Sequence, residues 1–258
     1  MNEVNKTLFI PLYGKSTVSK QHIILSDPDA ERIWEAESFP IRGKSKSKWL
    51  AYNMAMRARV FDNWTSRMLR KHPKALVLHI GCGLDSRFRR VKEPYRLWID
   101  CDLPDVIAIR KEYFDESGNY RMQALDASDP AQIQALPESD TTIVVLEGLS
   151  MYLSKAQLRG FLGALRKKYR VLCVLMDIYT EFGAKASKYK NPINEVGVFE
   201  VFGMDDPNGV GVLTFLREMD MTPEYLIAEL PKKDQRLFRK LYAGSFARKL
   251  YRLYEYEG

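Results

Sequence analysis

Acidic side chains follow four of the apolar runs in the middle of the chain. They are Asp100 and Asp102 after the second run, Asp126 after the third, Glu147 after the fourth and Asp177 after the fifth. A single acid in such a place often caps the helix that comes next. In an open parallel sheet, however, the carboxyl ends of the strands meet at one edge, and ligands bind there. We therefore expect these carboxylates to line one binding site.

A glycine turn follows the first apolar run, residues 75–80. It reads Gly81-Cys82-Gly83 and continues to Asp85. Glycine adopts a positive φ without strain and lets a ligand approach the backbone closely. The N–H groups of a helix that follows such a turn face the ligand. The pattern indicates a loop that binds a nucleotide-type cofactor, with Gly81, Gly83 and Asp85 as candidate contacts.

The acids indicate which cofactor this is. Asp100 and Asp102 both lie about 20 residues after the first glycine, where a carboxylate can accept hydrogen bonds from ribose hydroxyls. An acid after the third strand can accept from an adenine amino group, and Glu147 can bind an ammonium. These demands match S-adenosylmethionine. The dinucleotide fingerprint lacks its third glycine, because Ser86 occupies that position.

One arginine lies in the apolar stripe of the clearest predicted helix, residues 49–70. At 100° per residue, Arg57 falls on the same face as Phe61 and Trp64, whereas Arg59 falls on the opposite face. A charge in an apolar stripe is costly unless it is paired. We therefore expect an anionic partner for Arg57. That partner is either an internal carboxylate in a structural ion pair or the carboxylate of the methionine tail.

From residue 75 to residue 177 apolar runs alternate with amphipathic segments. Continuous apolar strands that alternate with helices indicate an α/β fold with a parallel sheet covered on both faces. Ser154 is expected to be the N-cap of the helix over residues 154–169. The expected strands are residues 75–80, 95–99, 120–125, 141–146 and 171–176, and the expected helices are 103–114 and 154–169.

The flanking segments break this alternation. Residues 1–48 look irregular apart from a helix over 29–38, and residues 1–72 are expected to cover the cofactor-binding core, 73–177. Residues 178–222 are rich in aromatics and turn residues, which is typical of a substrate lid. Residues 224–230 and 250–256 look like strands around a helix over 234–241. We expect residues 1–258 to form a single domain, of which 223–258 supply the last strands.

Candidate contacts to the methyl acceptor come mainly from the lid. They are Tyr152, Tyr179, Lys188, Tyr189 and Asn191. Methyl transfer to a carboxylate needs no general base, whereas a phenol or alcohol usually does. No histidine lies at an obvious acceptor position, and this favours a carboxylate. Asp177 or Tyr179 could still act as a base, so a phenol or alcohol stays open.

Composition narrows the class of protein. The chain has 258 residues and a formal net charge of +7. Three widely spaced cysteines without a metal or redox spacing favour a reducing compartment and no metal site. No apolar run is long enough for a membrane span, so we expect a cytoplasmic protein. The charge is spread along the chain, and we expect a small-molecule substrate and no nucleic-acid partner. The oligomeric state cannot be read from the sequence.

Several stretches resemble a known family. The sequence is similar to the leucine carboxyl methyltransferases, and within them to the bacterial branch of tetracenomycin-type polyketide O-methyltransferases. The resemblance extends over nearly the whole chain. The turn followed by Leu-Asp-x-Arg, with Glu-Gly-x-x-Met-Tyr-Leu downstream, is its most specific part. The matching stretches are Ser26–Ala30, Arg57–Asp62, Gly81–Arg87, Asp102–Ile107, Glu147–Leu153, Tyr189–Pro192 and Phe202–Pro207.

The resemblance implies a Rossmann-like class I methyltransferase fold. Its sheet would have seven mostly parallel strands with an antiparallel last strand, helices on both faces and an N-terminal helical cover. It implies S-adenosylmethionine as cofactor, S-adenosylhomocysteine as product and a small-molecule acceptor such as a polyketide. It implies roles for Arg57 with the donor carboxylate, Gly81 and Gly83 with the methionine tail, Asp102 with the ribose, Asp126 and Ala127 with adenine, and Glu147 with Gly148 at the amino group.

Two functions of other classes stay open at this point. A non-catalytic protein that binds S-adenosylmethionine or associates with RNA would account for the basic charge. An NAD(P)-linked oxidoreductase would account for the glycine turn, but it leaves Glu147 and Arg57 without a use. The choice between Asp100 and Asp102 for the ribose also stays open.

Overall fold

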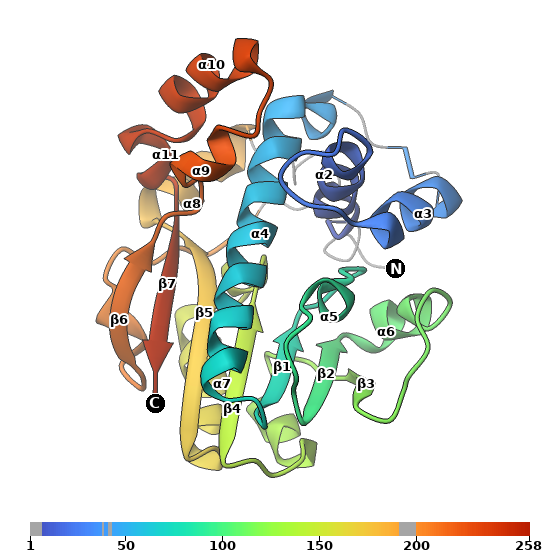
Figure 1. Cartoon of the computed structure of the whole chain (residues 1–258). Helices are drawn as coiled ribbons and strands as arrows, with labels where there is room; N and C mark the ends of the chain where they lie inside the picture. The colour runs from blue at the N-terminus through green and yellow to red at the C-terminus, as the bar shows by residue number, and fades with distance from the viewer. Residues whose placement is uncertain (1–6, 38, 41–42, 191–199) are drawn as a thin grey trace.

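A seven-stranded sheet forms the centre of the described part of the chain (Figure 1). The computed structural model describes residues 7–37, 39–40, 43–190 and 200–258. The strand order is β3-β2-β1-β4-β5-β7-β6, and β7 is antiparallel to both of its neighbours. The strands are β1 (Leu76–Ile80), β2 (Leu97–Asp102), β3 (Tyr120–Ala124), β4 (Thr141–Leu146), β5 (Val171–Tyr179), β6 (Thr214–Met219) and β7 (Tyr251–Glu257). This confirms the predicted class I methyltransferase fold.

Helices pack on both faces of the sheet because successive strand residues point to opposite sides. Val77 and Ile143 pack in one cluster with Phe61 of α4 (Lys48–Lys71). Leu78 and Val144 pack in the other cluster with the apolar face of α7 (Lys155–Lys168). Ser154 caps α7 in a capping box with Gln157, as the sequence predicts for Ser154.

The order in which strands are added to the sheet reverses at β1. This strand pairs with β2 on one side and with β4 on the other, both parallel. The chain therefore moves outward in opposite directions from the β1–β4 pair, and the carboxyl ends of these strands form the crevice where open α/β sheets bind ligands. α2 (Phe9–Lys20) and α3 (Pro28–Glu37) lie above these ends in Figure 1.

Three sequence-based expectations are wrong. The apolar patch at residues 8–13 is not irregular but begins α2, whose buried face includes Phe9 and Leu12. Residues 224–230 contain a short helix, α9 (Glu224–Ile227), where a strand was expected. The lid segment contributes an edge strand, β6, beside β7. In each case partners far away in the sequence decide the local structure, as tertiary context often does.

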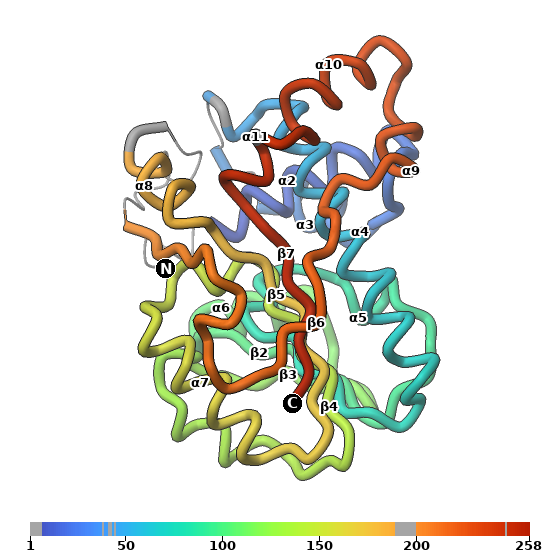
Figure 2. Tube along the Cα trace, turned by 90° about the vertical axis from the view of Figure 1, so that its left-hand side faces the viewer, coloured from blue at the N-terminus to red at the C-terminus, as the bar shows by residue number. Residues whose placement is uncertain are grey.

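The remaining helices are the α-helices α5 (Arg87–Arg90), α6 (Pro104–Arg110), α8 (Glu181–Lys190), α10 (Lys232–Tyr242) and α11 (Ser245–Arg248), and the 3₁₀ turns Gly43–Lys46, Pro130–Ala135, Ser150–Tyr152 and Pro207–Val210. Among them, α10 and α11 lie at the same end of the molecule as α2 and α3 (Figure 2). None of the helices in the described ranges is both long enough and apolar enough to cross a bilayer.

Candidate active site

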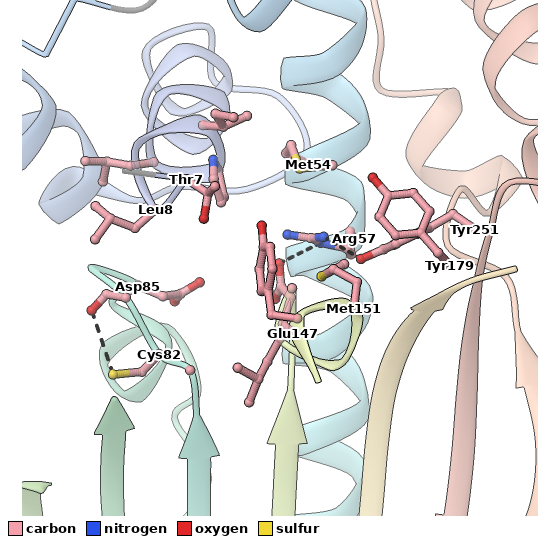
Figure 3. A pocket seen from close by; sticks show the side chains of 18 of the residues that line it. Thr7, Leu8, Met54, Arg57, Cys82, Asp85, Glu147, Met151, Tyr179 and Tyr251 are labelled. Atoms are coloured by element: carbon pink, nitrogen blue, oxygen red, sulfur yellow. Dashed lines mark hydrogen bonds and ion pairs between the residues drawn. The ribbon is translucent and has the colours of Figure 1, made fainter. Parts of the chain in front are cut away.

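A cavity of about 1140 Å³ lies over the carboxyl ends of the parallel strands. The glycine turn and the ends of β2 and β3 line one side of it. Aromatic and aliphatic side chains line the other side, with Arg57 and Glu147 between the two (Figure 3). The second side includes Trp49, Leu50, Met54, Met151, Tyr152, Tyr179, Leu241, Tyr242, Leu250 and Tyr251. The cavity therefore has a polar arm at the glycine turn and an apolar arm formed mainly by α4, the Ser150–Tyr152 turn, α10 and the start of β7.

The glycine turn has the backbone conformation that only glycine adopts easily. Gly81 has φ of 70° and Gly83 has φ of 51°. The N–H of Gly81 donates to the carbonyl of Cys101 at 2.8 Å, which ties the turn to β2. A β-carbon on Gly81 would lie 3.1 Å from the side chain of Leu149. Both glycines line the polar arm, as the sequence predicts.

The structure separates the two acids at the end of β2. Asp102 lines the cavity, and its carboxylate accepts from the N–H groups of Gly83 at 2.7 Å and Leu103 at 2.8 Å. Burial raises its pKa to about 6, although these two donors act in the opposite direction. Asp100 is fully buried, away from the cavity lining, in an ion pair with Arg110. The expectation that Asp100 contacts the cofactor is therefore wrong.

Asp126 and Ala127 follow β3 and line the polar arm. The Asp126 carboxylate accepts from the N–H of Ser128 at 2.8 Å, and its own N–H donates to Gln132 at 2.9 Å. These bonds fix the loop, and they leave further lone pairs of the carboxylate for a ligand. Both residues therefore line the cavity, and their contact with adenine stays a prediction.

Arg57 is buried and paired, as its place in the apolar stripe predicts. Its Nε donates to Glu147 at 2.9 Å, and its Nη1 lies 3.0 Å from Asp177 and donates to the Tyr251 hydroxyl at 3.1 Å. Burial disfavours the charged guanidinium, but Glu147, Tyr251 and Asp177 together more than compensate and raise the pKa of Arg57. Its Nη2 has no hydrogen-bond acceptor in the described parts of the chain, so it can still bind a carboxylate.

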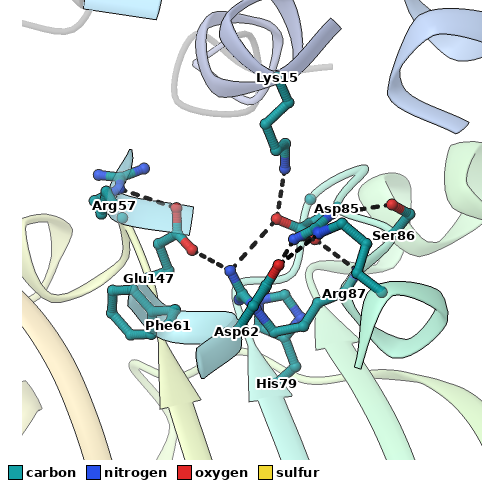
Figure 4. A network of polar contacts seen from close by, with 12 residues as sticks. Lys15, Arg57, Phe61, Asp62, His79, Asp85, Ser86, Arg87 and Glu147 are labelled. Carbon is teal, nitrogen blue, oxygen red and sulfur yellow. Dashed lines mark hydrogen bonds and ion pairs between the residues drawn. The ribbon is translucent and has the colours of Figure 1, made fainter. Parts of the chain in front are cut away.

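Glu147 lies between two guanidiniums (Figure 4). Arg57 donates to one of its oxygens and the fully buried Arg87 to the other. Burial alone would raise the pKa of Glu147, but Arg87 and Arg57 lower it to about 2. Gly148 follows with φ of 73° and donates its N–H to both oxygens of Asp177, at 2.8 and 3.0 Å. The carboxylate at the end of β4 is therefore ionised and fixed in place.

A buried network of ion pairs that no local sequence pattern predicted lies behind the polar arm. Lys15 of α2 contacts Asp85 at 2.5 Å, and Arg90 lies 2.9 Å from the same carboxylate. Arg87 donates to Asp62 of α4 at 2.7 Å. Asp85 lines the cavity as predicted, yet these cations already neutralise it. The network connects the N-terminal cover, α4 and the glycine turn (Figure 4).

The five predicted acceptor contacts differ in their placement. Tyr152 and Tyr179 line the cavity. Lys188 is exposed on α8 and lies outside the lining, so its predicted contact is wrong in this structure. The side chain of Tyr189 and all of Asn191 lie outside the described residues. Tyr251 of β7 also lines the cavity. From the sequence, Tyr251 was expected only as part of a strand over residues 250–256, with no role in the site.

A family comparison supports what this geometry suggests. The model of the leucine carboxyl methyltransferase family matches residues 11–165, which include the glycine turn, Arg57 and Glu147. The chain belongs to the leucine carboxyl methyltransferase family. It is therefore an S-adenosylmethionine-dependent methyltransferase, and the NAD(P)-linked alternative is wrong.

Two curated relatives of this methyltransferase have similar sequences. The tetracenomycin polyketide synthesis O-methyltransferase TcmP of Streptomyces glaucescens is 30% identical over 212 residues, which are 80% of this chain and 77% of the relative. The S-adenosyl-L-methionine-dependent methyltransferase dpfgK of Gibberella zeae is 31% identical over 179 residues, 64% of this chain and 60% of that protein.

A solved structure has the same fold. It is the magnesium protoporphyrin IX methyltransferase ChlM of Synechocystis PCC 6803 with bound S-adenosylmethionine, with a TM-score of 0.51. The match covers 95% of this chain and 96% of that chain at 9% sequence identity. At this identity the likeness shows the fold of the methyltransferase only.

Proposed function

We propose that this methyltransferase transfers a methyl group from S-adenosylmethionine to an oxygen of an apolar, polyketide-like small molecule. The observation that carries the proposal is the division of one cavity into a polar arm and an apolar arm. O-methylation is supported by the relative TcmP, whose name describes a polyketide O-methyltransferase.

The chemistry of the polar arm fits S-adenosylmethionine. The methionine tail has one carboxylate and one ammonium, and Arg57 and Glu147 lie side by side with opposite charges. Gly81 and Gly83 would line this tail, because a β-carbon at either would narrow the arm. When bound, S-adenosylmethionine supplies a methyl group that its sulfonium already activates.

The adenosine half fits the other acids of the same arm. Asp102 would accept hydrogen bonds from the ribose hydroxyls, because its carboxylate faces the cavity beside Gly83. Asp126 and Ala127 would contact the adenine. The chain would then position the donor and exclude water from it, with no metal in the reaction.

The apolar arm indicates an acceptor with an aromatic or aliphatic body. Its described lining is dominated by aromatic and aliphatic side chains, and the cations lining the described cavity, Lys15 and Arg57, are both paired with carboxylates. The sequence favoured a carboxylate acceptor because no histidine stood nearby. Asp177, already a possible base from the sequence, lies near the Tyr251 hydroxyl at Arg57, so a phenol or enol fits as well.

Two measurements test the proposal. Isothermal titration calorimetry should show that the protein binds S-adenosylhomocysteine. If the folded protein shows no binding, the proposed cofactor site is contradicted. Incubation of a metabolite extract with methyl-labelled donor should then label an apolar compound. Mild alkaline hydrolysis distinguishes the acceptors, since a methyl ester releases labelled methanol and a methyl ether does not. Label on nitrogen or carbon contradicts O-methylation.

A further inference from the structure

A tyrosine and a buried aspartate lie together where the apolar arm meets Arg57. Asp177 ends its apolar run inside β5 and is fully buried. Tyr251 begins β7, and its backbone pairs with Tyr179, two residues beyond Asp177. The Tyr251 hydroxyl and the Asp177 carboxylate contact the same nitrogen, Nη1 of Arg57, at 3.1 and 3.0 Å, which brings the two oxygens close together. Figure 3 shows Tyr251 and Tyr179 beside Arg57 at the wall of the cavity.

Only one member of this pair faces the cavity. Tyr251 lines it, whereas Asp177 lies behind and is absent from the lining. The Asp177 carboxylate already accepts from the Gly148 N–H and contacts Arg57 at 3.0 Å. The Tyr251 oxygen accepts one hydrogen bond from Arg57, at 3.1 Å, and its proton can be donated to Asp177, which contacts the same Arg57 nitrogen. A phenolic oxygen has a second lone pair, which remains for the O–H of an acceptor.

We propose that Tyr251 and Asp177 form a proton relay for a neutral O–H acceptor. The inference rests on the proposed function and assigns a role to two residues within it. As the acceptor oxygen forms its bond to the methyl carbon, the bond from that carbon to the sulfonium sulfur breaks and its electron pair goes to sulfur. The acceptor proton moves to the Tyr251 oxygen, and the Tyr251 proton moves to the Asp177 carboxylate.

The charges balance in this step. Before transfer the site contains one sulfonium cation and the Asp177 anion. After transfer it contains a neutral thioether and a neutral carboxylic acid, so no net charge is created or lost in a buried site. Buried charges without partners are costly, and the relay avoids both a free phenolate and an unpaired carboxylate.

The electrostatic environment agrees with these roles. Burial raises the pKa of Tyr251 well above its usual value, so its hydroxyl is protonated before the reaction. Burial also raises the pKa of Asp177, although Arg57 acts in the opposite direction, and a raised pKa favours uptake of a proton. The histidine in the lining, His79, lies 3.0 Å from the Arg87 guanidinium and is buried, so it is poorly placed to serve as the base.

The acidity of the acceptor distinguishes a relay from a structural role. The probes, compared at about pH 5.5, are 7-hydroxycoumarin, which is almost wholly neutral at that pH, and 6,8-difluoro-7-hydroxycoumarin, which has a similar shape but is largely ionised there. Tyr251→Phe should lower kcat on the neutral phenol by about 100-fold or more, the usual contribution of general acid–base catalysis. On the ionised phenol the loss should stay below about tenfold, because no proton must be removed.

Two further variants complete the test. Asp177→Asn should show the same selectivity as Tyr251→Phe. Tyr256→Phe is the matched control, because Tyr256 lies on the same strand outside the cavity lining and donates to the Pro207 carbonyl at 2.9 Å. Its kcat on both phenols should equal that of the wild type.

Equal losses on both phenols in Tyr251→Phe overturn the relay and leave Tyr251 a structural role. The relay is also overturned if the wild type methylates coumarin-3-carboxylate only, or methylates neither phenol. The proposed function is tested separately by calorimetry of S-adenosylhomocysteine binding. Wild-type protein that binds S-adenosylhomocysteine and fails on the phenols contradicts the relay alone.

Discussion

Arg57→Ala is the substitution that tests the site most directly. The guanidinium contacts two buried carboxylates, Glu147 at 2.9 Å and Asp177 at 3.0 Å, and is itself buried. Alanine leaves these carboxylates close together with one cation fewer. Glu147 keeps Arg87 as a counter-ion, whereas Asp177 keeps no cation among the described residues and still accepts from the backbone N–H of Gly148.

The magnitude follows from these contacts. Removal of one partner from a buried ion pair costs about 3–5 kcal/mol. In a chain of this length 1 kcal/mol shifts Tm by about 2–4 °C, so we expect Tm to fall by roughly 6–20 °C. A charge-assisted hydrogen bond to the donor carboxylate is worth about 1.5–3 kcal/mol. Its loss should weaken S-adenosylhomocysteine binding about 10- to 150-fold.

The assay compares Arg57→Ala with Arg59→Ala by calorimetry and thermal melting. Arg59 lies on the same helix but is exposed, so its removal should leave both quantities near the wild-type values. Arg57→Lys keeps the charge and loses the forked geometry, and it should bind with intermediate affinity. If Arg57→Ala and Arg59→Ala bind S-adenosylhomocysteine equally well, the assignment of Arg57 to the cofactor is refuted.

Three other outcomes are expected. Gly83→Ala should weaken S-adenosylhomocysteine binding about tenfold in calorimetry, because αL backbone costs a side chain about 1–2 kcal/mol, whereas Gly118→Ala, with open space around it, should not. The folded-state pKa of Glu147 is lower than its unfolded value. In urea titrations the stability advantage of wild type over Glu147→Gln should therefore be complete above about pH 5 and decline toward about pH 2. An advantage that does not change with pH contradicts this. Lys15→Met should speed hydrogen exchange in α2, because it removes the contact to Asp85, and unchanged exchange speaks against this anchor.

The local pattern of the sequence determined the framework of the site. Apolar runs bounded by glycine and acids predicted β1 and β4 within a residue of their ends, because buried parallel strands need continuous apolar residues. Gly81 and Gly83 predicted the turn, since its positive φ angles are a property of the backbone. The wheel position of Arg57 predicted a buried cation with an anionic partner, because an unpaired charge there is too costly.

Only the tertiary structure decided which groups face the ligand. By spacing alone, Asp100 and Asp102 are equally good candidates for the ribose contact. Because β2 ends at Asp102, Asp100 lies two residues further from the cavity, inside the sheet, where Arg110 pairs with it. Tyr251 meets Arg57 across 194 positions of sequence, because β7 enters the sheet antiparallel beside β5. Contacts of this kind depend on the packing of distant elements, and no local pattern encodes them. The glycine turn indicates that a cofactor binds, while the arrangement of β5, β7 and α4 determines what chemistry surrounds it.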